Sequence, residues 1–153
     1  MRISFDLDDT LICYQPGSLY EPTRVPLLLR HWFDEPLRLG AVSMMHQLSV
    51  LGCELGIYTT SLRSPTHLRR WFAFYGIKIA FVVNEAIHQT AIEPHRFQPR
   101  PSKYPPAFKI DLHIDDSSGV QTEGRSHGFS VIVVDPADEL WHEKVLNEVK
   151  RRL

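Results

Sequence analysis

The chain has 153 residues, of which 43% are hydrophobic and 23% charged, and its formal net charge is −1 at pH 7. This length predicts one domain with its own core, and the composition excludes a disordered, collagen-like or membrane-spanning chain. The near-zero net charge indicates no general attraction to nucleic acid or to an anionic membrane surface.

The N-terminus and the cysteines indicate the compartment. Charged residues such as Arg2 and Asp6 lie at the start of the chain. No apolar run approaches the roughly 18 residues of a membrane span. We therefore expect no signal peptide and a cytoplasmic location. Cys13 and Cys53 are the only cysteines. They form no C-x-x-C pair, so we expect reduced thiols and no cysteine-based zinc site. The histidines show no metal-ligand spacing, and none is assigned to a metal.

Short apolar runs that end in polar residues predict buried parallel strands, because such strands are nearly continuous hydrophobic stretches. These runs cover residues 3–7, 53–58, 79–83, 110–114 and 130–134. We therefore expect five strands, because each run is short enough to be a strand.

Helical spacing appears between the strand candidates. Residues 36–51 carry apolar side chains on one face and stop at Gly52, a second helix opens at Ser64-Pro65, and a third begins near Asp135. The alternation predicts an α/β fold, a three-layer sandwich around a Rossmann-like, mainly parallel sheet.

Two proline-containing segments interrupt the alternation. Residues 12–35 and 85–108 are predicted as loops, the first as a flap and the second as a Pro-rich loop. Neither resembles a linker between separate cores, since strands resume soon after each, so residues 1–153 are expected to form one catalytic domain. Long ordered loops in compact domains tend to carry function.

Acidic residues follow two of the predicted strands. Asp6 and Asp8 lie two residues apart and are expected on the same side of the first strand, and Asp115 and Asp116 end a later strand. The carboxyl ends of parallel strands share one edge of the sheet, where ligands bind in open α/β folds. Three or four carboxylates should therefore converge there.

Converging carboxylates repel one another unless a cation compensates their charge. Mg²⁺ prefers oxygen ligands, takes few of them from the protein and commonly bridges to a substrate phosphate. The two acidic pairs together therefore predict a magnesium site. Taken alone, Asp115-Asp116 could equally be a solvated loop or a helix N-terminus, because Ser117 and Ser118 can also start a helix.

These residues resemble the signature of the haloacid dehalogenase superfamily. The run from Phe5 to Thr10 resembles its opening Asp-x-Asp-x-Thr motif after a hydrophobic strand. The rest of the family's pattern follows in order: a strand ending in Thr59, a lysine at Lys103, and a strand ending in Asp115-Asp116. The resemblance spans nearly the whole chain.

The resemblance implies a phosphatase in which Asp6 attacks phosphorus and forms an aspartyl-phosphate. It implies Asp8 as general acid and base, Thr59 as a hydrogen-bond donor to the phosphoryl group, and Lys103 as its charge partner. It also implies that the metal is Mg²⁺, with Asp6, Asp8 through its backbone carbonyl, Asp115 and Asp116 as the ligand set.

Several assignments have alternatives. Thr59 could be a turn residue in Thr59-Thr60-Ser61. Thr60 and Arg63 are candidates for substrate contact, although Arg63 could instead only cover its helix. Lys109 competes with Lys103, because the family usually places a helix between the lysine and the second acidic pair. We favour Lys103, since Lys109 lies at the entrance of its strand and thus at the opposite end of the sheet.

Neither gap between the motifs has room for the cap domain that most members of the superfamily carry. The chain is therefore expected to be capless, with loops, the substrate itself or a neighbouring subunit shielding the site. The expected partner is a phosphorylated substrate, bulky or macromolecular, and a homo-oligomer would serve the same purpose. Aromatic residues of the first loop and Arg96 and Arg100 of the second are candidate wall residues.

Two other function classes compete with a phosphatase. A receiver-like, phospho-accepting signalling domain also combines acids, Thr and Lys around Mg²⁺, but it places the phosphorylated aspartate where this chain has Thr59. A catalytically idle binding module would not need Asp8. The substrate cannot be deduced from these residues, because fold and chemistry do not determine it.

Overall fold

A computed structural model describes residues 1–153 and has one parallel sheet of five strands in the order β3-β2-β1-β4-β5. The strands are β1 (Arg2–Phe5), β2 (Glu54–Tyr58), β3 (Phe81–Val83), β4 (Leu112–Asp115) and β5 (Val131–Val133). All five predicted strands are confirmed, with ends within two residues of the expected ones. β1 lies at the centre, between β2 and β4, so their carboxyl ends are neighbours.

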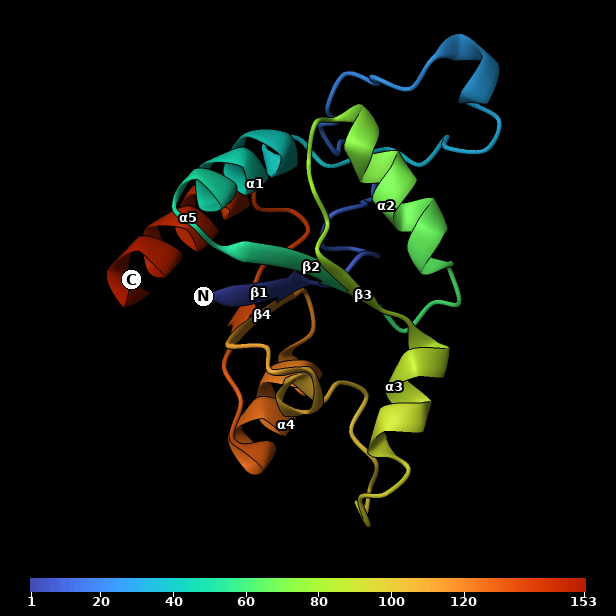
Figure 1. Ribbon diagram of the computed structural model, residues 1–153. Helices are drawn as coiled ribbons and strands as arrows, with labels where there is room; N and C mark the ends of the chain where they lie inside the picture. Colours follow the sequence, from blue (N-terminus) through green and yellow to red (C-terminus); the bar gives the residue numbers. More distant parts are fainter.

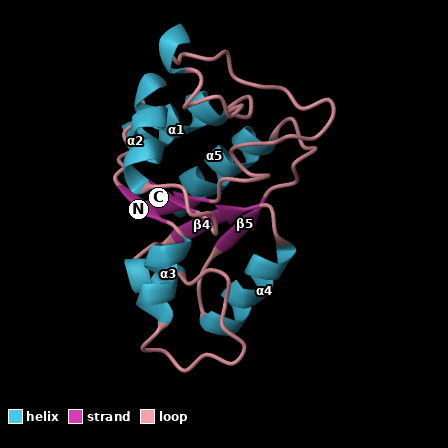
Figure 2. Cartoon of the chain, turned by 90° about the vertical axis from the view of Figure 1, so that its right-hand side faces the viewer, coloured by secondary structure: helices cyan, strands magenta, loops and turns pink.

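Five α-helices cover both faces of the sheet. They are α1 (Ala41–Val50), α2 (Pro65–Phe74), α3 (Glu85–Ile92), α4 (Ser118–His127) and α5 (Trp141–Arg152). Two 3-10 turns, η1 (Leu27–Leu29) and η2 (Pro105–Phe108), lie in the long connections. α1, α2 and α5 lie on one face, and α3 and α4 on the other (Figures 1 and 2). The predicted three-layer α/β sandwich is therefore confirmed.

The starts of two helices differ from the prediction. α1 begins at Ala41 rather than at residue 36, because Gly40 has a left-handed φ of 88° and the residues before it pair with the preceding loop. α5 begins at Trp141 rather than near Asp135. Nη2 of Arg38 binds the carbonyls of residues 135, 136 and 138, and this contact holds the segment before α5 in turns.

The prediction that residues 85–108 form a loop is wrong for their first third, which is α3. Asn84 caps this helix by accepting a hydrogen bond from the amide of Ile87. The prolines of the segment begin only at Pro94, beyond the end of the helix. The Pro-rich loop is therefore confined to the residues between α3 and η2.

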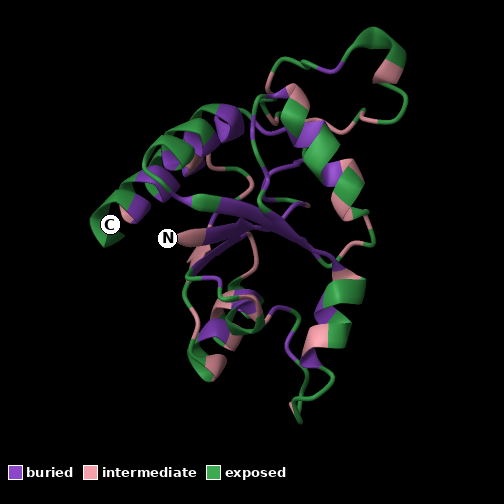
Figure 3. Ribbon diagram, in the orientation of Figure 1, coloured by how far each residue is buried: buried purple, intermediate pink, exposed green.

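In the loop between β1 and α1, backbone bridges join the first part of the loop to its last residues. Isolated bridges join Ile12 to Leu37 and Tyr20 to Arg38. Residues 22–36, here called the outer loop, extend beyond these bridges and are mostly exposed (Figure 3). The outer loop rests against α2, where the Phe33 ring stacks on His67 at 4.6 Å between ring centroids.

The main core contains 29 buried residues and includes the inner faces of α1, α2 and α5. A smaller cluster on β2 and β3 contains Tyr58 and Phe81. Gly56 of β2 is required there, because a Cβ atom at this position would lie 2.3 Å from the Phe81 ring. Both cysteines are buried and free. None of the helices combines the length and apolarity that crossing a membrane would need.

Candidate active site

Three of the predicted site residues lie at the carboxyl edge of the three central strands. Asp6 follows β1, Thr59 follows β2, and Asp115 ends β4. Because β1 lies between β2 and β4, these three side chains come from adjacent strand ends. The expectation that the two acidic motifs share one edge of the sheet is therefore met.

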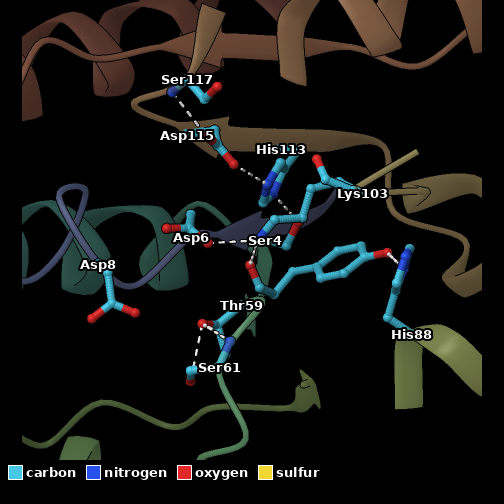
Figure 4. A network of polar contacts seen from close by, with 12 residues as sticks. Ser4, Asp6, Asp8, Thr59, Ser61, His88, Lys103, His113, Asp115 and Ser117 are labelled. Atoms are coloured by element: carbon cyan, nitrogen blue, oxygen red, sulfur yellow. Dashed lines mark hydrogen bonds and ion pairs between the residues drawn. The ribbon is translucent and has the colours of Figure 1, made fainter. Parts of the chain in front are cut away.

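Asp6 forms a buried ion pair with Lys103 (Figure 4). The Lys103 Nζ atom lies 2.5 Å from Oδ1 of Asp6 and 2.7 Å from the carbonyl oxygen of Tyr58. Only 2% of the Lys103 side chain and 11% of the Asp6 side chain are exposed. One carboxylate oxygen of Asp6 is thus held by the ammonium group, and no hydrogen bond engages the other.

The backbone around Lys103 is irregular, and two groups hold it in place. The Glu123 carboxylate on α4 accepts hydrogen bonds from the amides of Ser102 and Lys103 and from the Ser102 hydroxyl. The amide of Tyr104 donates to the Tyr58 hydroxyl at 2.8 Å. These contacts hold Lys103 in place without a helix around it.

A buried histidine completes the support of the loop that carries Lys103, here called the lysine loop. Nε2 of His88 donates to the carbonyl of Pro101 at 3.1 Å, so Nδ1 is free to accept a hydrogen bond from the Tyr58 hydroxyl at 2.6 Å. Lys109, by contrast, is exposed, at the C-terminal end of η2 before β4 begins. The geometry thus places Lys103, and not Lys109, against Asp6.

A second buried chain of hydrogen bonds orients Asp115. Nε2 of His113 donates to Oδ2 of Asp115 at 2.9 Å, while Nδ1 accepts from the Ser4 hydroxyl at 2.8 Å. The amide of Ser117 donates to the other carboxylate oxygen at 2.8 Å. Burial lowers the pKa of His113, which is consistent with a neutral ring in this arrangement.

The carboxyls at this edge differ in their electrostatics. Burial raises the pKa of Asp6 to about 7; Lys103 opposes this effect, and Asp115 and Asp116 add to it. Burial acts to raise the pKa of Asp115, but the hydrogen bonds from His113 and Ser117, together with the charges of His113 and Lys103, lower it below its ordinary value. Burial and the neighbouring Asp115 raise the pKa of Asp116. The cluster therefore has more negative charge than Lys103 alone compensates.

Asp8 does not lie with this group. The expectation that its carboxylate joins those of Asp6, Asp115 and Asp116 is wrong, because it binds Arg63 through two hydrogen bonds of 2.9 Å. Arg63 lies 55 residues from Asp8 in the sequence, so the two-residue spacing of Asp6 and Asp8 carried no sign of this pair. Arg63, expected as a substrate contact, is occupied by this pair and by Glu35.

Thr59 is buried, and its Oγ1 accepts a hydrogen bond from the amide of Ser61 at 3.1 Å and lies 3.2 Å from the Ser61 hydroxyl. This turn geometry agrees with the turn interpretation of Thr59-Thr60-Ser61 and leaves Thr59 at the edge of the sheet beside Asp6. Thr60 is exposed and has no side-chain hydrogen bond. Thr59 can therefore serve as a turn residue and as a phosphoryl contact at once.

The donor set at this edge fits a hard divalent cation but not a closed protein cage. No three His, Cys, Asp or Glu side chains gather as a metal cage. Asp6 and Asp115 offer carboxylate oxygens, with Asp116 and the Asp8 carbonyl nearby in the sequence, and excess negative charge surrounds Asp6. A cation with few protein ligands and several waters, such as Mg²⁺, suits this arrangement.

Sequence reasoning missed several residues that shape the site. Glu35 accepts a hydrogen bond from Arg63, and Glu123 accepts one from the lysine loop. Tyr58 and His88 also form hydrogen bonds with that loop. His113 lies in a predicted strand and was assigned no role in the site. Its position two residues before Asp115 was the one available signal, because side chains two apart lie on the same face of a strand.

The comparisons with known proteins concern the fold. No family model matches the sequence, and no curated protein matches it. Among solved structures, the chain is similar to a candidate beta-phosphoglucomutase from Thermotoga maritima, with a TM-score of 0.60, 14% identity and 99% of each chain covered. It is also similar to a chain of a Pnkp1/Rnl/Hen1 complex, with a TM-score of 0.53, 14% identity, and coverage of 89% of this chain and 46% of that one. These similarities show that the chain shares the α/β fold of these two structures.

Proposed function

We propose that this protein is a magnesium-dependent phosphatase that hydrolyses phosphomonoesters through an aspartyl-phosphate on Asp6. The observation that carries the proposal is the buried pair between Asp6 and Lys103, residues 97 positions apart in the sequence. A lysine buried against a strand-end carboxylate fits a site that binds phosphate, because the ammonium group can fix the nucleophile and offset phosphoryl charge.

The proposed reaction has two steps. The free carboxylate oxygen of Asp6 attacks phosphorus, the bond from phosphorus to the ester oxygen breaks, and Asp8 gives its proton to the leaving alcohol. Water then attacks the phosphoryl group on Asp6, Asp8 takes a proton from that water, and inorganic phosphate leaves. Lys103 keeps its contact with Asp6 throughout, and Thr59 and Thr60 supply hydrogen-bond donors to the phosphoryl oxygens.

Asp6, Asp115 and the Asp8 carbonyl would hold Mg²⁺, with Asp116 beside them. When bound, the metal offsets charge on the phosphoryl oxygens and orients the group for in-line attack. His113 would keep the Asp115 carboxylate in one orientation, since ligand carboxylates are commonly hydrogen-bonded by a second layer of residues.

The test is hydrolysis of an aryl phosphate by purified protein, with Mg²⁺ or with a chelator. We expect turnover only with Mg²⁺ and none in Asp6→Asn. Asp9→Asn is the matched control, because Asp9 is exposed in the same turn and has a φ of 57° that asparagine also tolerates. Turnover in Asp6→Asn equal to that of the control would discard the nucleophile assignment.

The open edge supports a further part of the proposal. The substrate is bulky or macromolecular, or a second copy of the chain covers the site, because no cap domain accompanies the sheet and a phosphoryl site must exclude water. The enzyme acts in the cytoplasm. A screen of phosphorylated metabolites and phosphopeptides, run beside a measurement of mass in solution, tests these statements.

One observation favours a second candidate, a catalytically idle binding module. The proposed general acid is engaged by Arg63 rather than directed at the nucleophile. Under this alternative, wild-type protein binds phosphorylated ligands but hydrolyses none of them, and a stable phosphoprotein would instead point to the receiver-like class. Steady Asp6-dependent release of phosphate excludes both.

A further inference from the structure

Arg63 lies at the centre of a three-residue ion-pair group, here called the Arg63 cluster, which consists of Arg63, Asp8 and Glu35. Nη1 and Nη2 of Arg63 each donate to one carboxylate oxygen of Asp8 at 2.9 Å. Nε donates to Oε1 of Glu35 at 3.1 Å, and Nη2 also contacts that oxygen. Four contacts therefore occupy a guanidinium group that has five N–H bonds.

The cluster joins three parts of the chain that are distant in sequence. Asp8 belongs to the turn after β1, Arg63 precedes α2, and Glu35 is at the end of the outer loop. The Tyr14 hydroxyl also reaches Oε1 of Glu35, at 3.4 Å. The Phe33 contacts with His67 and Phe74 also attach the outer loop, and Val25 and Leu29 of this loop pack in or against the main core.

The charges of the cluster do not balance. One guanidinium faces two carboxylates, so Asp8 and Glu35 compete for the same cation. Burial alone would lower the pKa of Arg63, but the hydrogen bonds that Arg63 donates to Asp8 and Glu35, together with the charges of these carboxylates, raise it. The guanidinium therefore stays charged in either pairing. If Asp8 leaves, Glu35 remains as the counter-ion, and the cation is never left unpaired.

We propose that Arg63 is a positioning residue that withholds Asp8 from the phosphoryl site in the substrate-free protein, and that Glu35 competes with Asp8 for it. The inference rests on the proposed function, in which Asp8 transfers the proton. In Figure 4 no hydrogen bond joins Asp8 to Asp6, Lys103 or Thr59. Asp8 must release Arg63 before it can serve a substrate, and Glu35 holds the guanidinium when it does.

The two partners of Arg63 therefore have opposite effects on turnover. Arg63→Gln removes the cation that holds Asp8, so kcat for a small aryl phosphate rises. Glu35→Gln leaves Asp8 as the only carboxylate on Arg63, so Asp8 is released less readily and kcat falls. Partly exposed ion pairs have modest energies, and we expect changes of about five-fold in each direction.

Both substitutions nevertheless weaken the attachment of the outer loop, because each removes the ion pair between Arg63 and Glu35. Hydrogen–deuterium exchange of residues 22–36 should therefore increase in Arg63→Gln and in Glu35→Gln alike, without any ligand present. A merely structural role of the cluster would change kcat in the same direction in both variants. A direct substrate contact by Arg63 would instead raise KM in Arg63→Gln and leave Glu35→Gln unchanged.

The experiment measures kcat and KM for an aryl phosphate with Mg²⁺, and exchange of the outer loop, in the wild type and in four variants. The controls are Arg70→Gln, which removes an exposed charge on α2, and Asp34→Asn, which removes an exposed charge next to Glu35 in the outer loop. Opposite changes in kcat with faster exchange in both test variants, and neither change in the controls, support the proposal.

Three results overturn it. They are unchanged exchange of the outer loop, changes in kcat of the same sign, and an effect confined to KM. Failure of the proposed function is recognised separately, because exchange needs no substrate. Faster exchange in both test variants together with no turnover in any protein would reject the phosphatase and retain the Arg63 cluster as the contact that fastens the outer loop.

Discussion

The hydrogen-bond chain from Ser4 through His113 to Asp115 offers the sharpest test of how the site at the carboxyl edge of the sheet is stabilised. All three side chains are buried, and His113 has no exposed surface. His113→Leu removes both ring nitrogens while keeping an apolar side chain at this position of β4. The Ser4 hydroxyl and one oxygen of Asp115 would then be buried without their partner.

The expected loss can be estimated from these two contacts. A hydrogen bond to a carboxylate contributes roughly 1.5–3 kcal/mol, and a buried hydroxyl left without a partner costs about 1 kcal/mol or more. The leucine recovers part of this through apolar burial. We therefore expect the free energy of unfolding to fall by about 3 kcal/mol, which corresponds to a fall of roughly 9 °C in Tm for a chain of this size.

Urea denaturation at neutral pH measures this quantity directly. His31→Leu, at an exposed position, serves as the control and should stay within about 0.5 kcal/mol of the wild type. Ser4→Ala should cost about 1 kcal/mol alone but add less in the His113→Leu background, because no orphaned hydroxyl remains there. A loss below about 1 kcal/mol in His113→Leu would refute the reasoning.

Three further predictions concern other contacts. At about pH 8, Lys103→Met should lose about 3 kcal/mol in urea denaturation, because it leaves Asp6 buried without a cation, whereas exposed Lys109→Met should lose almost nothing; equal losses would contradict the assignment. Burial lowers the pKa of His88, so the unfolded chain binds its proton more readily; the stability that His88 contributes is present above its ordinary pKa of 6.5 and is lost as the pH falls below it. His88→Gln should accordingly lose less stability than the wild type between about pH 7.5 and pH 5, in parallel denaturation curves. Gly56→Ala should cost about 2 kcal/mol through its clash with the Phe81 ring, and Phe81→Leu in the same protein should reduce that cost.

The strands and the acidic residues at the carboxyl edge of the sheet could be predicted from the sequence because the patterns that mark them are local. Apolar runs define β1 to β5, and the acids that follow β1 and β4 mark where these strands end. Once a parallel sheet is assumed, the meeting of Asp6 and Asp115 at one edge follows from topology alone. The predicted fold was confirmed because these local signals mark every strand of the sheet.

The rest of the site depends on contacts that no local pattern encodes. Glu123 supports the lysine loop from a helix some 20 residues away, and Glu35 reaches Arg63 from 28 residues away. α3 was missed because prolines later in the segment outweighed its short helical pattern, although Asn84 is a good N-cap residue. Asp8 was misplaced because its partner, Arg63, lies 55 residues away in the sequence.

The separation of Asp6 and Asp8 has a physical rationale in the proposed chemistry. A nucleophile must stay in one position, and Asp6 is buried and fixed by Lys103, with 11% of its side chain exposed. A group that first donates and then accepts a proton must move between partners, and the Asp8 side chain is 46% exposed. Two carboxylates that are close in sequence thus bind different cations: Asp6 binds the buried Lys103, and Asp8 binds Arg63. Catalysis by both would then depend on the Asp8–Arg63 pair opening while the Asp6–Lys103 pair remains closed.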